Sequence, residues 1–133
     1  MSSVLPDLQI GHAPHGYDDF GLNARWVRAA YQASRPIYDR WFRVSSTGAE
    51  VLNGLGGAIL AANHSGTLPV DAVLIWHDVI RNTHPTRVPR PVADIFVSNL
   101  PFVSQLYART GVVVGSRGNV HRLLDDGELL MLF

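Results

Sequence analysis

Short apolar runs alternate with helical segments along this sequence, and the alternation restricts the folds that are open to it. The run GAILAA at Gly57–Ala62 follows a glycine-rich turn and is typical of a strand that is buried on both faces. Three further runs are predicted strands: Ala93–Val97, Gly111–Val114 and Glu128–Phe133. Helices are predicted between them, at 69–80, 103–109 and 119–126. Such alternation indicates an α/β fold with a mixed, largely parallel sheet flanked by helices.

The other segments complete a plan with one domain, which is what 133 residues allow. Residues 1–20 show little periodicity, so we interpret them as an irregular arm before a single domain at 21–133. Residues 22–42 are predicted to be helical, with a break or kink at Pro36, and 43–50 to be a polar connection or a short strand. Residues 81–91, with three prolines, are a predicted loop. A buried strand seldom ends a domain, so we expect the domain to be truncated after Phe133.

Composition narrows the classes of partner. Eleven arginines balance eleven acidic residues, so the net charge is zero and the basic excess of a nucleic-acid-binding protein is missing. There is no lysine, and a cationic site must therefore use guanidinium, which binds phosphate with a planar fork. There is no cysteine, which excludes disulfides and thiolate ligands. The apolar runs are well short of the roughly 18 residues that a membrane-spanning helix needs.

The segment Ala62–Ala72, ANHSGTLPVDA, carries the most chemistry. It places His64 at the tip of a predicted strand, where ligands bind in open α/β sheets, and Asp71 in the first turn of the next helix. A carboxylate beside an imidazole fixes one tautomer and leaves the other nitrogen to accept a proton. A continuous helix would hold the two residues about 10 Å apart, whereas Gly66 and Pro69 predict a turn that folds Asp71 back toward the ring. Spacing alone also allows a solvated or core histidine and a simple helix-dipole partner.

Two motifs give the chain a resemblance to the glycerophospholipid acyltransferase superfamily, which includes lysophospholipid and 1-acylglycerol-3-phosphate acyltransferases. ANHSGTLPVDA is similar to the first block of that family, Asn-His-x4-Asp, although the spacing here is His-x6-Asp. Gly111–Arg117, GVVVGSR, is similar to the second block, in which an arginine follows a glycine and an apolar strand. Phe133 matches the first residue of a third block, Phe-Pro-Glu-Gly. The resemblance thus covers the N-terminal part of such a domain.

The resemblance implies an O-acyltransferase of phospholipid synthesis that moves a fatty acyl group from a thioester to a hydroxyl. The donor would be acyl-CoA or acyl carrier protein, the acceptor a lysophospholipid or glycerol-phosphate, and no cofactor is implied. His64 and Asp71 would be the catalytic pair, and Arg117 would bind the acceptor phosphate. The other substrate-binding positions would be Asn63, Ser65, Gly66 and Gly111. Amphiphilic substrates imply a peripheral position on the cytoplasmic face of the membrane.

Other functions remain open at this point. One is a non-catalytic lipid-binding or acyl-binding module, which would suit this chain if it lacks the third block and is inactive alone. Another is a hydrolase of the same thioester, with water in place of the alcohol. No pair among the other histidines has metal-ligand spacing, so we expect no metal. Ser65 does not lie in a Gly-x-Ser-x-Gly elbow, which gives a serine hydrolase little support.

Overall fold

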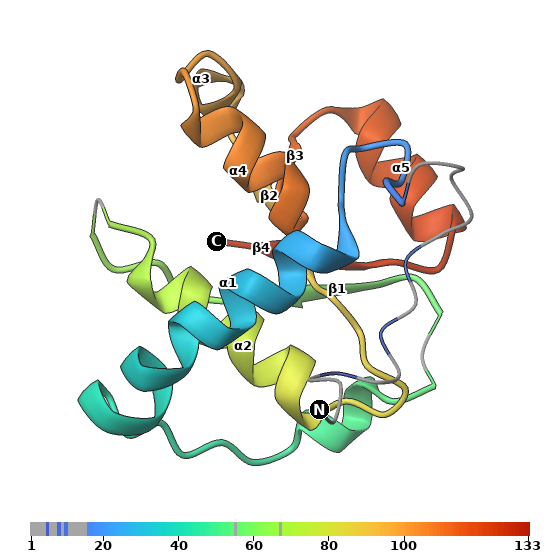
Figure 1. The fold of residues 1–133 in the computed structure, drawn as a ribbon. Helices are drawn as coiled ribbons and strands as arrows, with labels where there is room; N and C mark the ends of the chain where they lie inside the picture. Colours follow the sequence, from blue (N-terminus) through green and yellow to red (C-terminus); the bar gives the residue numbers. More distant parts are fainter. Residues whose placement is uncertain (1–4, 6–7, 9, 11–15, 55, 67) are drawn as a thin grey trace.

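The computed structural model describes residues 5, 8, 10, 16–54, 56–66 and 68–133. Four strands form one sheet in the order β1-β4-β2-β3, and every pairing in it is parallel: β1 (Ala58–Ala61), β2 (Arg90–Ala93), β3 (Val113–Val114) and β4 (Leu129–Leu132). The α-helices around it (Figure 1) are α1 (Ala24–Pro36), α2 (Val70–Asn82), α3 (Ile95–Ser98), α4 (Val103–Thr110) and α5 (Arg117–Asp125). The predicted α/β class with a parallel sheet is confirmed. Among the described residues, no helix has the length and apolar character to cross a bilayer.

Strand β4 joins the two halves of the core. Successive residues of a strand point to opposite faces, so neighbours in β4 enter different clusters. Leu130 packs with Val113 and Leu123 on the side of α5. Met131 packs on the side of α1 and α2, in a cluster that also contains Leu8, Leu22, Val27, Trp76, Ile80 and Val88. Helices therefore cover both faces of β4.

Strand β1 is less buried than predicted. Within the described part of the chain it pairs only with β4, so it lies at an edge of the sheet. Its burial alternates along the strand: Leu60 packs against the α1 and α2 cluster, whereas Ile59 is 51% exposed. The prediction of a strand buried on both faces was wrong here, because an apolar run does not reveal which of its faces a neighbour covers.

The first helical region continues through its proline. Asn23 caps α1, and its side chain accepts hydrogen bonds from the N–H groups of Arg25 and Trp26. Pro36 has no N–H, and the chain passes from α1 into a π-helix, η1 (Ile37–Trp41), in which Phe42 N–H donates to Ile37 O at 2.9 Å. The proline therefore changes the hydrogen-bond pattern without ending the helix. Residues 43–48 form no strand, and a 3-10 helix, η2 (Ala49–Leu52), follows.

Strand β2 occupies part of the predicted loop. The predicted strand at Ala93–Val97 was wrong, because β2 ends at Ala93 and Ile95–Ser98 are helical. Asp94 accepts a hydrogen bond from Phe96 N–H at 3.3 Å, and this cap overrides the strand preference of the apolar side chains. Pro91 belonged to the predicted loop, and proline is uncommon in a central strand. It is accommodated because β3 pairs with β2 only from Val92 onward.

The remaining elements agree with the sequence apart from their ends. Helix α2 starts at Val70, with Pro69 just before it, and α4 lies where it was predicted. Helix α5 starts two residues before the predicted position 119, because Ser116 caps it. Gly127 follows its end with φ +82°, as expected of a left-handed glycine. The described residues of the predicted arm form no helix or strand, and 1–4, 6–7, 9 and 11–15 lie outside the described residues.

Candidate active site

His64 and Asp71 form the central contact of the candidate site. His64 follows the end of β1, and Asp71 lies in the first turn of α2. The Nδ1 atom of His64 is 2.9 Å from Oδ1 and 3.0 Å from Oδ2 of Asp71. The turn that the sequence predicted thus brings the carboxylate to the ring across the His-x6-Asp spacing. Both side chains are partly open to solvent, with exposed fractions of 36% for His64 and 24% for Asp71.

The loop between the pair fixes the carboxylate as well as the ring. Ser65 N–H donates to Asp71 Oδ2 at 2.8 Å, and Ala72 N–H donates to Oδ1 at 2.8 Å. The hydrogen bond from Ser65, with those from Ala72 and His64, holds the pKa of Asp71 below its ordinary value. Gly66 adopts φ +107°, a conformation that side-chain-bearing residues rarely adopt, so a glycine suits this turn. The aspartate is therefore ionised near neutral pH.

This geometry determines which nitrogen of His64 is free. An ionised carboxylate only accepts hydrogen bonds, so Nδ1 must carry the proton. In the neutral ring Nε2 is then the basic nitrogen, and it makes no hydrogen bond with any residue that the structure describes. The ring of Phe133 lies against the imidazole, with centroids 5.3 Å apart and an interplanar angle of 55°. The pair can therefore take a proton at Nε2 and stabilise the resulting imidazolium.

Phe133 is a contact that residue-by-residue analysis of the sequence did not predict. It follows β4, the strand that pairs with β1 in the register Ala61 to Leu132. The same edge of the sheet thus delivers His64 and Phe133 side by side, and Figure 1 shows the C-terminus close to the loop that leads from β1 to α2. The match of Phe133 to the first residue of the third block indicated a position near the site. It did not indicate contact with the ring of His64.

The other predicted site residues lie at different distances from the pair. Asn63 and Gly66 are exposed in the same loop as His64, and Ser65 contributes its main-chain N–H to Asp71. Arg117 is exposed as the first residue of α5, just after β3. It shares the carboxyl edge of the sheet with His64, but three inter-strand spacings, about 14 Å, separate β1 from β3.

Gly111 is not brought to this edge. It lies before β3, at the opposite end of that strand from Arg117, and it ends α4 with φ +111°. A Cβ at this position would be 3.4 Å from Pro89 O and 3.6 Å from Arg90 Cδ, next to the start of β2. Glycine is thus favoured there by the backbone conformation, whereas these distances are ordinary van der Waals contacts. Its substrate-binding role stays a prediction that this placement does not support.

An apolar pocket of about 210 Å³ lies beside the ends of β2 and β3, and its lining includes Ala93, Val97, Tyr107 and Val114 but neither His64 nor Asp71. In the part of the chain that the structure describes, no three His, Asp or Glu side chains come together in a way that could hold a metal ion.

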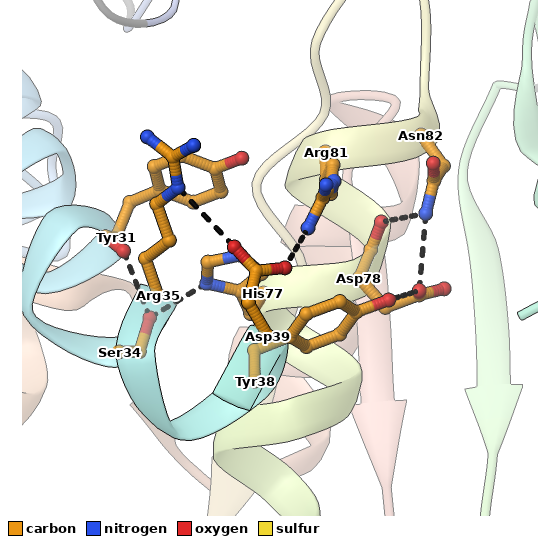
Figure 2. A network of polar contacts seen from close by, with 9 residues as sticks. All are labelled: Tyr31, Ser34, Arg35, Tyr38, Asp39, His77, Asp78, Arg81 and Asn82. Carbon is orange, nitrogen blue, oxygen red and sulfur yellow. Dashed lines mark hydrogen bonds and ion pairs between the residues drawn. The ribbon is translucent and has the colours of Figure 1, made fainter. Parts of the chain in front are cut away.

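A second histidine network lies on α2, and the sequence did not predict it (Figure 2). His77 is fully buried between the rings of Tyr31 and Tyr38, with centroid distances of 4.2 and 4.5 Å. Its Nδ1 is 2.7 Å from Ser34 Oγ. The spacing of Tyr31, Ser34 and Tyr38 indicates one face of a helix, but nothing in the sequence connects that face to a residue 43 positions beyond Ser34.

A parallel α/β sheet with an imidazole–carboxylate pair at its carboxyl edge defines a class of proteins able to perform general-base chemistry on a bound ligand. Comparison with known proteins makes the assignment specific. The family model described as Acyltransferase matches residues 43–133, and the chain belongs to this family, the glycerophospholipid acyltransferases. Membership supports a general acyltransferase function.

The relatives of the chain are themselves uncharacterized. An uncharacterized protein of Mycobacterium leprae is 34% identical over 119 residues, which cover 87% of this chain and 32% of the relative. Uncharacterized proteins of Mycobacterium bovis and Mycobacterium tuberculosis are 31% identical over 121 residues, which cover 90% of this chain and 34% of each relative. The chain therefore spans about a third of the length of the curated relatives it matches. No solved structure gives a significant match.

Proposed function

We propose that the protein is an O-acyltransferase that moves a fatty acyl group from a thioester to a hydroxyl of a lysophospholipid or glycerol-phosphate acceptor. The donor would be acyl-CoA or acyl carrier protein, and the reaction would belong to phospholipid synthesis. The observation that carries the proposal is the contact of His64 Nδ1 with both carboxylate oxygens of Asp71, which leaves Nε2 as the open basic nitrogen.

In the proposed reaction His64 Nε2 takes the proton of the acceptor hydroxyl as its oxygen attacks the thioester carbonyl. The carbon–sulfur bond breaks, a carbon–oxygen ester bond forms, and the imidazolium returns its proton to the leaving thiolate. Asp71 holds the ring and offsets its positive charge while the proton resides there. General-base catalysis of this kind contributes about 10²- to 10⁴-fold in rate. No acyl-enzyme intermediate is needed.

Arg117 is proposed to bind the acceptor phosphate. Its guanidinium is exposed and makes no ion pair with any described residue, so it is available for a bidentate contact. It lies on the carboxyl edge of the sheet, across two strands from His64. An acceptor held between them would have its hydroxyl at the imidazole and its phosphate toward α5.

Acyl-transfer assays of the full-length protein test the proposed function. Radiolabelled acyl-CoA or acyl carrier protein is supplied with and without lysophospholipid or glycerol-phosphate, and the lipid products are separated. We expect labelled ester only in the presence of acceptor. Free fatty acid in equal amounts with and without acceptor would show a thioester hydrolase. Binding of the thioester with neither product would show a non-catalytic module.

Replacement of Arg117 tests the acceptor site. We expect Arg117→Ala to raise KM for a phosphate-bearing acceptor about tenfold, because one charge-assisted contact is lost, and to leave KM for the thioester nearly unchanged. Steady-state kinetics with each substrate varied in turn measures both constants. The matched control is Arg25→Ala, which removes another exposed guanidinium, on α1. An equal effect on both substrates would contradict the assignment.

A further inference from the structure

The turn at the end of η1 exposes aromatic, aliphatic and basic side chains together. Trp41 is 80% exposed, Phe42 48% and Ile37 42%, and Arg40 and Arg43 are exposed beside them. We call these five residues the Trp41 surface. An exposed indole is unusual because burying an aromatic ring is strongly favourable, and exposed apolar groups that cluster mark interaction sites.

The Trp41 surface is held in place from behind. The hydroxyl of Tyr38 donates to Asp78 on α2, and Ser46, beyond the turn, donates to the same carboxylate at 2.7 Å. Asp39 accepts a hydrogen bond from Arg81 at 2.5 Å. Figure 2 shows Tyr38 and Asp39 directed toward α2, and Figure 1 shows η1 at the lower left, away from the sheet. Both ends of the turn are thus fixed to α2, which holds the Trp41 surface in place relative to that helix.

The Trp41 surface also carries a local positive charge, although the whole chain has a net charge of zero. Arg40 and Arg43 make no ion pair with any residue that the structure describes. The nearby carboxylate, Asp39, is already paired with Arg35 at 3.2 Å and with Arg81. Two guanidinium groups are therefore available beside a protruding indole.

We propose that the Trp41 surface docks on an anionic lipid bilayer. Tryptophan is favoured at the headgroup level of membranes, and arginine is attracted to anionic lipids. A bilayer accepts protruding rings without a shaped pocket, and its negative charge complements Arg40 and Arg43. The docking is peripheral and requires no step of the proposed acyl transfer, so either proposal can fail without the other.

Vesicle co-sedimentation with the full-length protein tests this docking. The probes are phosphatidylcholine vesicles with and without 30 mol% phosphatidylglycerol, at low and high salt. The variants are Trp41→Ala and the double variant Arg40→Gln/Arg43→Gln, all at exposed positions. The matched control is Phe102→Ala, which removes an 87% exposed ring at the start of α4. Circular dichroism and thermal midpoints establish that each variant is folded.

We expect the wild type to bind the anionic vesicles and to be released by high salt. The double arginine variant should lose about thirtyfold in partitioning to anionic vesicles, since each arginine near the surface contributes roughly fivefold. Trp41→Ala should lose about tenfold, and Phe102→Ala should stay within about twofold of the wild type. Brominated lipid should quench the tryptophan fluorescence of the wild type more than that of a Trp41→Phe variant.

Three results would overturn the proposal. The first is equal binding by the wild type and Trp41→Ala. The second is a loss in Phe102→Ala as large as that in Trp41→Ala, which would place the contact on α4. The third is no vesicle binding by the wild type.

Discussion

Two histidines of this protein, one in the loop before α2 and one on α2, make similar first contacts in different surroundings. His64 lies just before α2, and its Nδ1 meets the carboxylate of Asp71. His77 lies in the second half of α2, and its Nδ1 meets the hydroxyl of Ser34. The first ring is 36% exposed, whereas the second is fully buried between two tyrosines.

The surroundings of the two rings differ in the charges and hydrogen-bond partners that they offer to a protonated histidine. Ser34 Oγ donates to Tyr31 O at 3.0 Å, so it accepts from His77 Nδ1, and the buried Nε2 of His77 has no hydrogen-bond partner among the described residues. Burial, and then the nearby Arg81, lower the pKa of His77 and keep the ring neutral. His64 instead lies beside the ionised carboxylate of Asp71, and its Nε2 makes no hydrogen bond with a described residue. The two rings therefore differ in the charge beside them as well as in burial.

The largest expected effect comes from removing the ring of His64. We expect His64→Ala to lower kcat for acyl transfer on the order of 10³-fold, because the general base is lost. The thermal midpoint should change little, since the side chain is partly exposed. Transfer assays and thermal denaturation measure the two effects, with His121→Ala, at an exposed position on α5, as the control. Near-wild-type turnover would sink the assignment of His64.

Removing the ring of His77 should lower stability and leave activity nearly unchanged, the opposite of the effect expected at His64. We expect His77→Ala to lower the free energy of unfolding by about 3 kcal/mol, because it leaves a cavity between two stacked rings. Activity per folded molecule should stay close to that of the wild type. Urea denaturation and transfer assays at a temperature where the variant is folded give both quantities. A large loss of kcat in the folded variant would mean that this network also serves the reaction.

The carboxylate of Asp71 can be tested without loss of volume. Asp71→Asn removes the charge that stabilises the imidazolium and presents an amide donor to Nδ1, which favours the wrong tautomer of His64. We expect kcat to fall on the order of 10²-fold. The control is Asp78→Asn, which changes a carboxylate of the second network and should affect stability more than kcat. Equal kcat in Asp71→Asn and the wild type would leave His64 without a partner in the mechanism.

The smallest expected effect is a difference in pH dependence. Because the pKa of His77 is lowered in the folded protein, the unfolded chain binds more protons below about pH 6.5, and stability should fall as the pH falls from there. The slope for one such group is at most about 1.4 kcal/mol per pH unit. Stability measured from pH 7 to 5 should show this slope in the wild type and lose it in His77→Phe.

The pH window of Asp71 is separate. Its pKa is lowered in the folded protein, so its contribution is complete above about pH 4 and is lost as the pH falls toward the folded pKa. Asp71→Asn should therefore reduce the loss of stability that the wild type shows as the pH falls below about 4, which urea denaturation at acidic pH measures.

Local signals explain how far the sequence could go in predicting the fold and the site. Gly66 and Pro69 indicated a turn, and that turn is what brings Asp71 to His64. Where such signals were missing or misleading, the predictions from sequence were wrong. The start of strand β2 was predicted as a loop because it contains Pro91, and the helix that begins after Asp94 was predicted as a strand because its residues are apolar. The edge position of β1 was also hidden, because strand order depends on pairings between segments distant in the chain.

The sequence by itself determined the alternation of strands and helices, the loop that carries His64 and Asp71, and the family resemblance of its motifs. Only the tertiary structure decided that Phe133 packs on His64, that Gly111 lies away from the site, and that His77 is buried while Trp41 is exposed. The physical reason is the distance along the chain over which each kind of interaction acts. Turn and capping preferences act between residues close in the chain, whereas burial and ring contacts depend on which distant surfaces pack together.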